Sequence, residues 1–264
     1  MNIEAVIPAR NEERYIERTL QALVRQTLRP SRIIVVNDGS TDRTAEIAAK
    51  YADVVVNLPD RGYRAAGTPV LARVINRGLR EVTPEADYVL ILGADDVLPN
   101  TYLEEIVRRM KADKAVMASG VVKGVWTREF AVRGVRVVNA RWWRRYGLRY
   151  PIKFGWEAWL IFRALKDGLR VKVYDDLVTY PQREVASSIN RYYKWGRGMK
   201  ALNYWPPYAL ARVLRISLKS PRKALALLKG YLTPTEPIKD VQDFVSTFQR
   251  IYLGRKLFWV LRLS

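Results

Sequence analysis

The sequence predicts an α/β fold in which helices flank a mostly parallel sheet, followed by a C-terminal region of basic amphipathic helices. Short apolar runs alternate with amphipathic segments over roughly the first 120 residues, which is typical of a parallel sheet with helices on both faces. Polar and acidic residues directly follow three of these runs. Because the carboxyl ends of parallel strands meet at one edge of a sheet, where ligands bind, we expect these residues to lie close together.

The first predicted strand covers residues 2–8 and ends at Pro8. Asn11 and Glu12 follow at its carboxyl end. A helix is predicted over residues 11–26, because its apolar residues form one stripe at helical spacing.

The second predicted strand covers residues 32–37, an apolar run of the kind found in strands that are buried on both faces. It leads into a tight turn that carries Asp38, and Ser40 or Thr41 is expected to cap the helix predicted over 42–51. This places the Asp38 carboxylate at the ligand-binding edge. A turn-forming Asp is the alternative interpretation.

The third strand of this kind covers residues 87–92 and is followed by two adjacent carboxylates, Asp95 and Asp96. Pro99 is expected in the first turn of the next helix. Residues 124–155 have a less regular pattern. The other predicted elements are strands at 53–57, 114–122 and 170–174, and helices at 67–80, 99–111, 156–167 and 186–200.

The composition restricts the chemistry that the chain can perform. The 264 residues include no Cys and no His, which excludes disulfides, thiolate or imidazole metal sites and Ser-His-Asp triads. Acid–base chemistry must therefore rest on Asp, Glu, Lys, Tyr or Arg. No signal peptide is expected, and no apolar run approaches the ~20 residues that a membrane-spanning helix needs.

The net charge of +20 predicts attraction to phosphate, in a nucleic acid, an anionic lipid or a phosphorylated substrate. Basic residues concentrate at 123–153 and in the last third of the chain, where aromatic residues are interleaved with them. That mixture suits a membrane interface or stacked sugars as well as a nucleic acid. A solvated basic surface is the alternative interpretation.

Five motifs occur in an order that resembles one known family. They are Val6-Ile7-Pro8-Ala9-Arg10-Asn11-Glu12-Glu13, Val35-Val36-Asn37-Asp38-Gly39-Ser40-Thr41-Asp42, Asn76-Arg77-Gly78-Leu79, Gly93-Ala94-Asp95-Asp96 and Phe154-Gly155-Trp156-Glu157. Over roughly residues 1–200 the chain resembles the family 2 inverting glycosyltransferases, which have the glycosyltransferase-A fold. It resembles in particular the membrane-associated members that add sugars to lipid-linked glycans in archaea and bacteria.

The resemblance implies where a nucleotide binds. In the family, the first motif holds the nucleoside and the Asp of the second accepts a hydrogen bond from the base, which a carboxylate can do with a ring N–H. The nucleotide-binding set implied here is Pro8, Ala9, Arg10, Asn11, Glu12, Asp38, Ala94 and Asp95.

The resemblance also implies a divalent cofactor, Mn²⁺ or Mg²⁺, ligated by Asp95. The family's metal motif is Asp-x-Asp, and Gly93 stands where its first acid is expected. We expect weaker metal binding, or a transfer of part of the phosphate binding to Arg side chains. Alternatively, Asp95 and Asp96 only cap the following helix.

The family's catalytic base lies in a Glu-Asp pair at the start of a helix. Glu157 matches the Glu, while Ala158 stands at the Asp position, so Glu157 is the candidate base that takes a proton from the acceptor hydroxyl. A structural acid that interacts with the helix dipole is the alternative. Asp175 and Asp176 are further candidates.

A basic segment beyond residue 187 is the candidate phosphate or acceptor site, with Arg191, Lys194 and Arg197 as the binding residues. Only Arg191 fully matches the corresponding motif of the processive members, which favours transfer of a single sugar. A solvated basic helix is the alternative interpretation.

Residues 201–264 are expected to form amphipathic helices, separate in role from a catalytic domain at 1–200. Arg212, Arg215 and Lys219 share one face of the first such helix, and Ser220 is expected to cap the next. These helices could pack on the catalytic domain or on a second copy in a homodimer. They could instead lie in the interface of an anionic membrane, which would place the protein peripherally on the cytoplasmic face of the cell membrane.

We therefore expect an enzyme that transfers a single sugar, with inversion, from GDP-mannose or a UDP-sugar to a lipid-linked acceptor, either polyprenyl phosphate or its glycan. The alternatives are a basic α/β nucleic-acid-binding protein and a sugar-phosphate nucleotidyltransferase. No nucleic-acid partner is expected, because carboxylates gathered at one edge would repel a phosphate backbone. The nucleotidyltransferase's Gly-rich phosphate loop is absent from the sequence, as is the dinucleotide-binding Gly-x-Gly-x-x-Gly.

Overall fold

The computed structural model describes residues 1–123, 134–183 and 188–262, with side chains in the last helix as far as Tyr252. Part of the basic stretch at 123–153 therefore lies outside the described residues. Two compact units are present, and we call them the sheet unit and the helical unit. The sheet unit comprises Met1–Arg64, Arg73–Tyr150 and Asp167–Val185, and the helical unit comprises Ala65–Ala72, Pro151–Lys166 and Ala186–Ser264. The predicted division into a catalytic domain at 1–200 and amphipathic helices at 201–264 stays a prediction.

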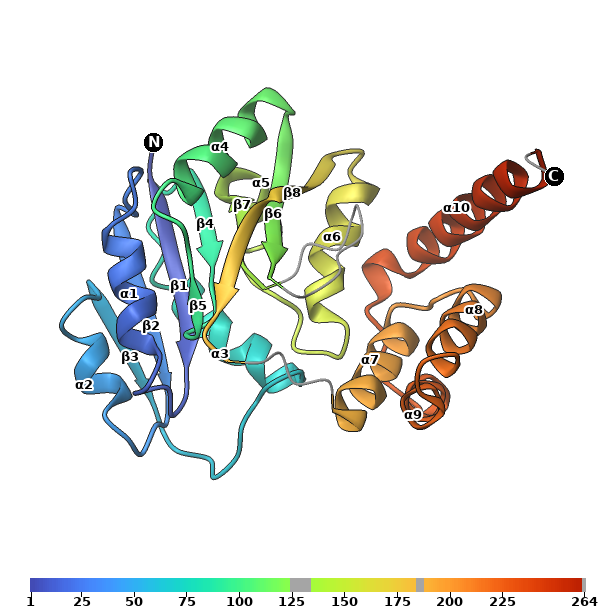
Figure 1. Cartoon of the computed structure of the whole chain (residues 1–264), viewed down its shortest axis with the longest axis horizontal. Coiled ribbons are helices and arrows are strands. Elements are labelled where there is room, and N and C mark those ends of the chain that lie inside the picture. Colours follow the sequence, from blue (N-terminus) through green and yellow to red (C-terminus); the bar gives the residue numbers. More distant parts are fainter. Residues whose placement is uncertain (124–133, 184–187, 263–264) are drawn as a thin grey trace. The chain divides into compact units, whose positions relative to one another are not determined.

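The sheet unit is built on one twisted sheet of mostly parallel strands, as predicted (Figure 1). Its strand order is β3-β2-β1-β4-β7-β6-β8-β5. The pairs β1–β2, β2–β3, β1–β4 and β6–β8 are parallel, whereas β7 and β5 pair antiparallel with their neighbours. The strands are β1 (Ile3–Ala9), β2 (Arg32–Asp38), β3 (Val54–Leu58), β4 (Tyr88–Ile91), β5 (Asp96–Val97), β6 (Ala115–Val122), β7 (Arg136–Asn139) and β8 (Arg170–Pro181).

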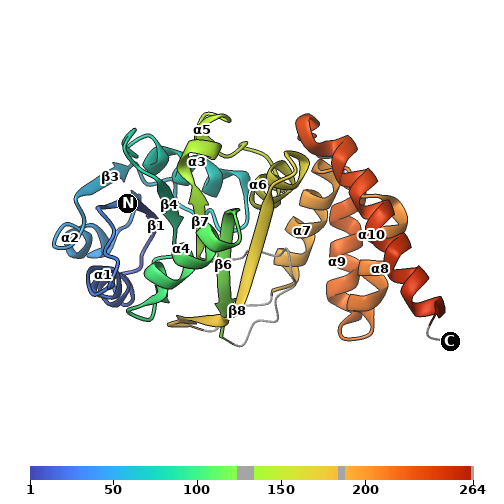
Figure 2. The same cartoon turned by 90° about the horizontal axis from the view of Figure 1, so that it is seen from above.

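Helices cover both faces of this sheet, with α1 and α4 on one side and α3 and α5 on the other (Figure 2). Leu20 of α1 and Leu90 of β4 belong to the same fully buried cluster, and replacing such a residue by Ala costs about 2–5 kcal/mol. On the opposite face, a Cβ on Gly78 of α3 would lie 2.6 Å from Val6 and 2.7 Å from Val36, so the helix packs closely there. The helices that flank the sheet are α1 (Ile16–Val24), α2 (Thr44–Ala48), α3 (Pro69–Leu79), α4 (Tyr102–Ala112) and α5 (Ala140–Arg144).

The predicted helix starts after β2 and β4 were wrong by a few residues. Ser40 and Thr41 do not cap α2, because that helix begins at Thr44 and its N-cap residue is Arg43. The Ser40 hydroxyl instead accepts from the Asn11 N–H, and the Thr41 N–H donates to the Asn11 side chain. Pro99 lies before α4, whose N-cap is Thr101.

The strand β7 and the helix α5, within the less regular stretch at 124–155, were not predicted, and neither was the two-residue strand β5. Such short elements carry too little periodicity to be recognised. The strand predicted at 170–174 extends to Pro181, where Tyr180 pairs with Val97 and Pro181 pairs with Asp96. This pairing brings the end of β8 beside the acids that follow β4.

The helical unit contains α6 (Trp156–Lys166), α7 (Ile189–Ala201), α8 (Pro206–Ser217), α9 (Pro221–Leu232), a short 3₁₀ turn (Lys239–Val241) and α10 (Gln242–Arg262). Two glycines let α7 and α9 pack closely. A Cβ would lie 2.1 Å from the Leu227 carbonyl oxygen at Gly196, and 2.0 Å from the Tyr193 carbonyl oxygen at Gly230. The Ser220 side chain makes no capping bond to α9, so the start of that helix relies on Pro221 in its first turn.

Among the described residues, no helix combines the length and the apolar character needed to cross a membrane.

Candidate active site

The ends of β1 and β2 lie level at the carboxyl edge of the sheet, where Ala9 pairs with Asn37. β4 runs parallel to β1 on its other side, with Val6 opposite Ile91. The polar segments that follow β1, β2 and β4 therefore share one edge, as the pattern of strands predicts.

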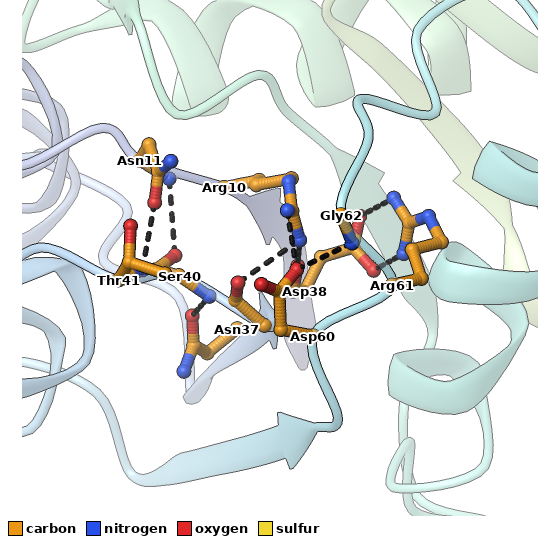
Figure 3. A network of polar contacts seen from close by, with 10 residues as sticks. Arg10, Asn11, Asn37, Asp38, Ser40, Thr41, Asp60, Arg61 and Gly62 are labelled. Atoms are coloured by element: carbon orange, nitrogen blue, oxygen red, sulfur yellow. Dashed lines mark hydrogen bonds and ion pairs between the residues drawn. The ribbon is translucent and has the colours of Figure 1, made fainter.

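Asp38, the last residue of β2, lies at this edge with only 3% of its surface exposed. Both of its carboxylate oxygens accept hydrogen bonds from the guanidinium of Arg61, in the segment after β3 (Figure 3). Arg10 donates to the Asp38 carbonyl at 2.5 Å and to the Gly39 carbonyl at 2.9 Å, and it pairs with Asp60 at 2.5 Å. Asp38 therefore presents a buried acceptor with a guanidinium directly beside it.

Asn11 cross-links the two loops rather than standing free at the edge (Figure 3). It has a positive φ of 52°, its N–H donates to the Ser40 hydroxyl at 3.0 Å, and its side-chain oxygen accepts from the Thr41 N–H at 2.9 Å. Asn37 accepts from the Ser40 N–H at 3.1 Å and donates to Asn57 at 2.8 Å. These bonds hold the loops after β1 and β2 in one arrangement.

Glu12 is 5% exposed, and one of its carboxylate oxygens accepts from Arg64 at 2.9 Å and from Arg183 at 2.8 Å. Its N–H donates to the Thr44 hydroxyl at 2.8 Å. The other carboxylate oxygen, Oε2, is buried and has no hydrogen-bond partner among the described residues. Burial raises the pKa of Glu12, and the hydrogen bond from Arg183 opposes that rise.

Asp95 follows β4 and pairs with the same arginine, since Nε of Arg183 lies 2.6 Å from its carboxylate. The Asp95 carbonyl accepts from the Gln182 N–H at 2.8 Å. Ala94 is buried, and its carbonyl accepts from the Thr19 hydroxyl at 3.0 Å. Of Ala94, only the backbone is suited to ligand contact.

Asp96 is held close to Asp95, and its burial together with the negative charge of Asp95 raises its pKa to about 7. Gly93 lies directly beside both acids. A Cβ there would be 2.8 Å from an Asp96 carboxylate oxygen and 3.0 Å from one of Asp95, so an acid at this position would need both side chains to shift.

Pro8 and Ala9 are strand residues of β1, and Ala9 contributes its side chain to the buried core. Their predicted contact with a nucleotide can therefore involve Pro8 and the backbone of Ala9, but not the Ala9 methyl group.

A divalent ion is chemically compatible with the Asp95 carboxylate. Within the described part of the chain, no group of three or more acidic side chains is placed to hold a metal. Mg²⁺ usually keeps several waters and binds through one or two carboxylates together with substrate phosphates. The donor set therefore fits an ion that arrives with a diphosphate rather than a resident one.

The candidate base and the basic residues beyond residue 187 lie in the helical unit. Glu157 is an exposed residue in the first turn of α6. Asp176, a further candidate base, lies within β8. Both of its carboxylate oxygens accept hydrogen bonds from the guanidinium of Arg109 in α4, each at 2.6 Å, so this carboxylate forms a bidentate ion pair.

The three predicted phosphate-binding residues of α7 have partners within that unit. The Arg191 guanidinium lies 5.2 Å from the centre of the Trp195 ring. Lys194 donates to the carbonyl of Ala66 at 2.8 Å. Arg197 donates to the Thr235 hydroxyl at 3.2 Å and lies 4.2 Å from the ring of another residue, Phe154.

Three arginines that the sequence motifs did not indicate pair with the acids at the edge, namely Arg61, Arg64 and Arg183. The only signal was their position shortly after the ends of β3 and β8. Which acid each arginine contacts depends on the strand order, and the motifs do not encode that order.

The α/β fold, with a mostly parallel sheet flanked by helices, is glycosyltransferase-A-like and matches glycosyltransferases of known structure. Residues 4–169 match the model of glycosyl transferase family 2, so the chain belongs to that family. The predictions of fold class and of a glycosyltransferase domain are confirmed.

Solved structures share this fold. The mannosyltransferase PcManGT from Pyrobaculum calidifontis, in complex with GDP-Man and Mn²⁺, is 17% identical with a TM-score of 0.61, covering 97% of this chain and 86% of that one. TarS from Staphylococcus aureus, in complex with UDP-GlcNAc, is 18% identical with a TM-score of 0.58, covering 88% and 72%.

Two curated relatives match over shorter stretches. Glycosyltransferase GlyA from Streptococcus pneumoniae is 29% identical over 45% of this chain, and 4,4'-diaponeurosporenoate glycosyltransferase from S. aureus is 44% identical over 22%. Each match covers only 16% of the relative's own length.

Proposed function

We propose that this protein transfers a single sugar, with inversion, from a nucleotide sugar to a lipid-linked acceptor at a membrane surface. The observation that carries the proposal is the line of acids at the carboxyl edge of the sheet, Asp38, Glu12 and Asp95, each paired with an arginine. Such a line offers acceptors for a base and cations for a diphosphate within the same loops.

The base is recognised by Asp38 and Arg61. Uracil and guanine both present a ring N–H next to a carbonyl oxygen, and a carboxylate beside a guanidinium complements that pair. The Asp38 carboxylate accepts from the ring N–H, while Arg61 moves to the neighbouring base oxygen. The fold neighbours include proteins solved with GDP-Man and with UDP-GlcNAc, so both GDP-mannose and a UDP-sugar are supported as donors.

The diphosphate is held at Asp95, next to Arg183 and Arg64. A divalent ion, Mn²⁺ or Mg²⁺, would be ligated by Asp95 and supply positive charge to neutralise the leaving diphosphate. Mn²⁺ in the PcManGT complex supports this assignment. The two guanidiniums add charge-assisted hydrogen bonds to phosphate oxygens.

In the transfer itself, an acceptor oxygen attacks the anomeric carbon from the face opposite the diphosphate, and the bond from that carbon to the diphosphate oxygen breaks. An acceptor hydroxyl loses its proton to the Glu157 carboxylate. A phosphate acceptor has no such proton to lose, which suits the presence of Ala158 where the family has its second acid. The two proposed acceptors are therefore polyprenyl phosphate and its glycan. We propose that Arg191, Lys194 and Arg197 bind the phosphate groups of these acceptors.

The membrane-facing surface is proposed to be α8 together with Leu218 and Lys219, which directly follow it. Leu210, Leu214 and Leu218 recur every four residues and are 53%, 58% and 88% exposed. Arg215 and Lys219 are also exposed beside them. An apolar stripe flanked by cations complements an anionic lipid surface, which supports peripheral binding at the cytoplasmic face of the cell membrane. The name of the diaponeurosporenoate relative is consistent with a lipid-like acceptor.

A thermal-shift panel of UDP, GDP and their sugars, with and without Mn²⁺, tests this function. A ligand at 100 times its Kd stabilises the folded state by about 2.7 kcal/mol, so the matching nucleotide should raise the Tm by several degrees. No shift with any nucleotide, together with tight and salt-sensitive binding of DNA or RNA, would replace the proposal by the nucleic-acid-binding alternative.

A further inference from the structure

Arg183 joins two acids that come from different strands of the sheet. Its Nη2 lies 2.8 Å from Glu12, after β1, and its Nε lies 2.6 Å from Asp95, after β4. One guanidinium thus bridges two carboxylates that come from different strands.

The fold holds Arg183 in this place. The preceding strand, β8, pairs with β5 next to Asp96, and the Gln182 N–H bonds the Asp95 carbonyl at 2.8 Å. The guanidinium also lies 5.3 Å from the centre of the Tyr15 ring, within the range of a cation–π contact. The bridging position is therefore set by backbone pairing as well as by charge.

Arg183 compensates the negative charge of the two acids that it bridges. Glu12 is only 5% exposed, so its carboxylate has little access to water. The ion pairs of Arg183 with Glu12 and Asp95 bring one cation directly to both carboxylates, which a buried charge needs.

Glu12 can accept a further hydrogen bond or bind a cation, since its buried Oε2 has no hydrogen-bond partner among the described residues. Carboxylate oxygens of this kind are the ligands that Mg²⁺ and Mn²⁺ prefer. The place that Arg183 fills between Glu12 and Asp95 is therefore one that attracts a divalent ion as well.

We propose that Arg183 is an internal counter-cation that keeps free divalent metal away from Asp95 until a nucleotide binds. In the absence of a nucleotide, the guanidinium and a divalent ion compete for the same carboxylates. A diphosphate supplies negative charge to which Arg183 can turn, so metal and nucleotide bind cooperatively. This inference rests on the proposed function, because it presumes that a diphosphate is bound at this edge.

The test is a titration of Mn²⁺ alone, without nucleotide, into the full chain, with free Mn²⁺ measured by electron paramagnetic resonance. Removal of one positive charge from direct contact with Asp95 should tighten Mn²⁺ binding, and Arg183→Gln should lower the Kd by at least about tenfold. Arg64→Gln is the matched control. Among the described contacts it shares Glu12 with Arg183 but does not reach Asp95, so its effect should stay below about threefold.

Two further variants keep the result interpretable. Arg183→Lys retains the charge but has one ammonium group where the guanidinium spans both acids, so an intermediate Kd is expected even if Arg183→Gln does not fold. Arg183→Gln combined with Asp95→Asn should lose the gained Mn²⁺ binding, which would identify Asp95 as the ligand.

Unchanged or weaker Mn²⁺ binding in both Arg183 variants would overturn the inference. If those same variants still respond to nucleotides in the thermal-shift panel, the proposed function survives and only the role of Arg183 is lost. If the wild type responds to no nucleotide, the proposed function fails, whatever the Mn²⁺ titration shows.

Discussion

At the scale of single residues, the edge of the sheet is a set of acids whose ionisation depends on their neighbours. Asp96 illustrates this dependence. It is partly buried next to Asp95, and both effects disfavour its charged form. Its pKa of about 7 means that the folded protein retains a proton there that the unfolded chain releases near pH 4.

The sign of the resulting pH dependence follows from that difference. Between about pH 4 and 7 the folded state binds more protons at Asp96 than the unfolded state, so this group lowers the free energy of unfolding as the pH rises. Asp96→Asn removes the effect. We expect the free energy of unfolding of Asp96→Asn, taken relative to wild type, to increase by on the order of 2–4 kcal/mol from pH 4.5 to pH 8 in metal-free buffer.

Urea unfolding at the two pH values measures the free energy of unfolding of both proteins. The control is Glu104→Gln, which removes an exposed acid. A stability difference between Asp96→Asn and wild type that is the same at pH 4.5 and pH 8 would contradict this prediction.

The acids of the site could be predicted from the sequence, whereas their partners could not. Asp38 and Asp95 follow apolar runs that are recognisable as strands, and parallel pairing then brings them to one edge. Arg183 reaches Asp95 only because β8 continues to Pro181 and pairs with β5, an element of two residues. Pairings of this kind depend on the tertiary fold and leave no local pattern.

At the scale of secondary structure, the contact between α7 and α9 depends on two glycines. A side chain at Gly196 would meet the backbone of α9, which cannot move aside as a flexible side chain can. The glycines themselves were visible in the sequence. Their role was not, because it depends on which helices cross.

Gly196→Ala should therefore destabilise the helical unit, although Ala is the better helix former by about 1 kcal/mol. Overpacking of this kind costs about 1–3 kcal/mol. We expect a net loss of thermal stability relative to Lys229→Ala, an exposed substitution on α9. A Tm for Gly196→Ala equal to or above that of wild type would show that the two helices do not pack as described.

The longer strands and helices were predictable at the same scale because their apolar residues repeat often enough. β1, β2 and β4 lie within one or two residues of the predicted strands, and α6 ends one residue from its predicted end. The shorter β7 and α5 were missed for the opposite reason. The helix cap predicted after β2 was wrong because α2 begins at Thr44, with Arg43 as its N-cap, and the Ser40 hydroxyl accepts from Asn11 instead.

At the scale of the whole molecule, the proposed binding to an anionic membrane rests on the net charge of +20 and on the exposed Leu210, Leu214 and Leu218. Each Lys or Arg near an anionic bilayer contributes about 1 kcal/mol, and a buried Leu side chain contributes about 1.5–3 kcal/mol. Together a few of each would suffice for the proposed peripheral binding.

Replacing Leu214 and Leu218 together by Glu should reduce binding to phosphatidylglycerol vesicles by at least about tenfold, since it removes apolar area and adds repulsion. Ile251→Glu, which changes an exposed apolar residue outside the stripe, is the control and should bind like wild type. Vesicle sedimentation measures both. If the double variant sediments with vesicles as wild type does, α8 is not the membrane surface, and if it instead converts a dimer to a monomer, a second copy covers the leucines.

Calorimetric titration of UDP and GDP, in the presence of Mn²⁺, into wild type, Asp38→Asn and Asp95→Asn tests most directly whether a nucleotide binds along this edge. Hydrogen bonds to charged groups are worth about 1.5–3 kcal/mol, so each variant should bind the preferred nucleotide at least about tenfold more weakly while keeping the wild-type fold. Wild-type affinity in both variants would contradict nucleotide binding at the carboxyl edge of the sheet.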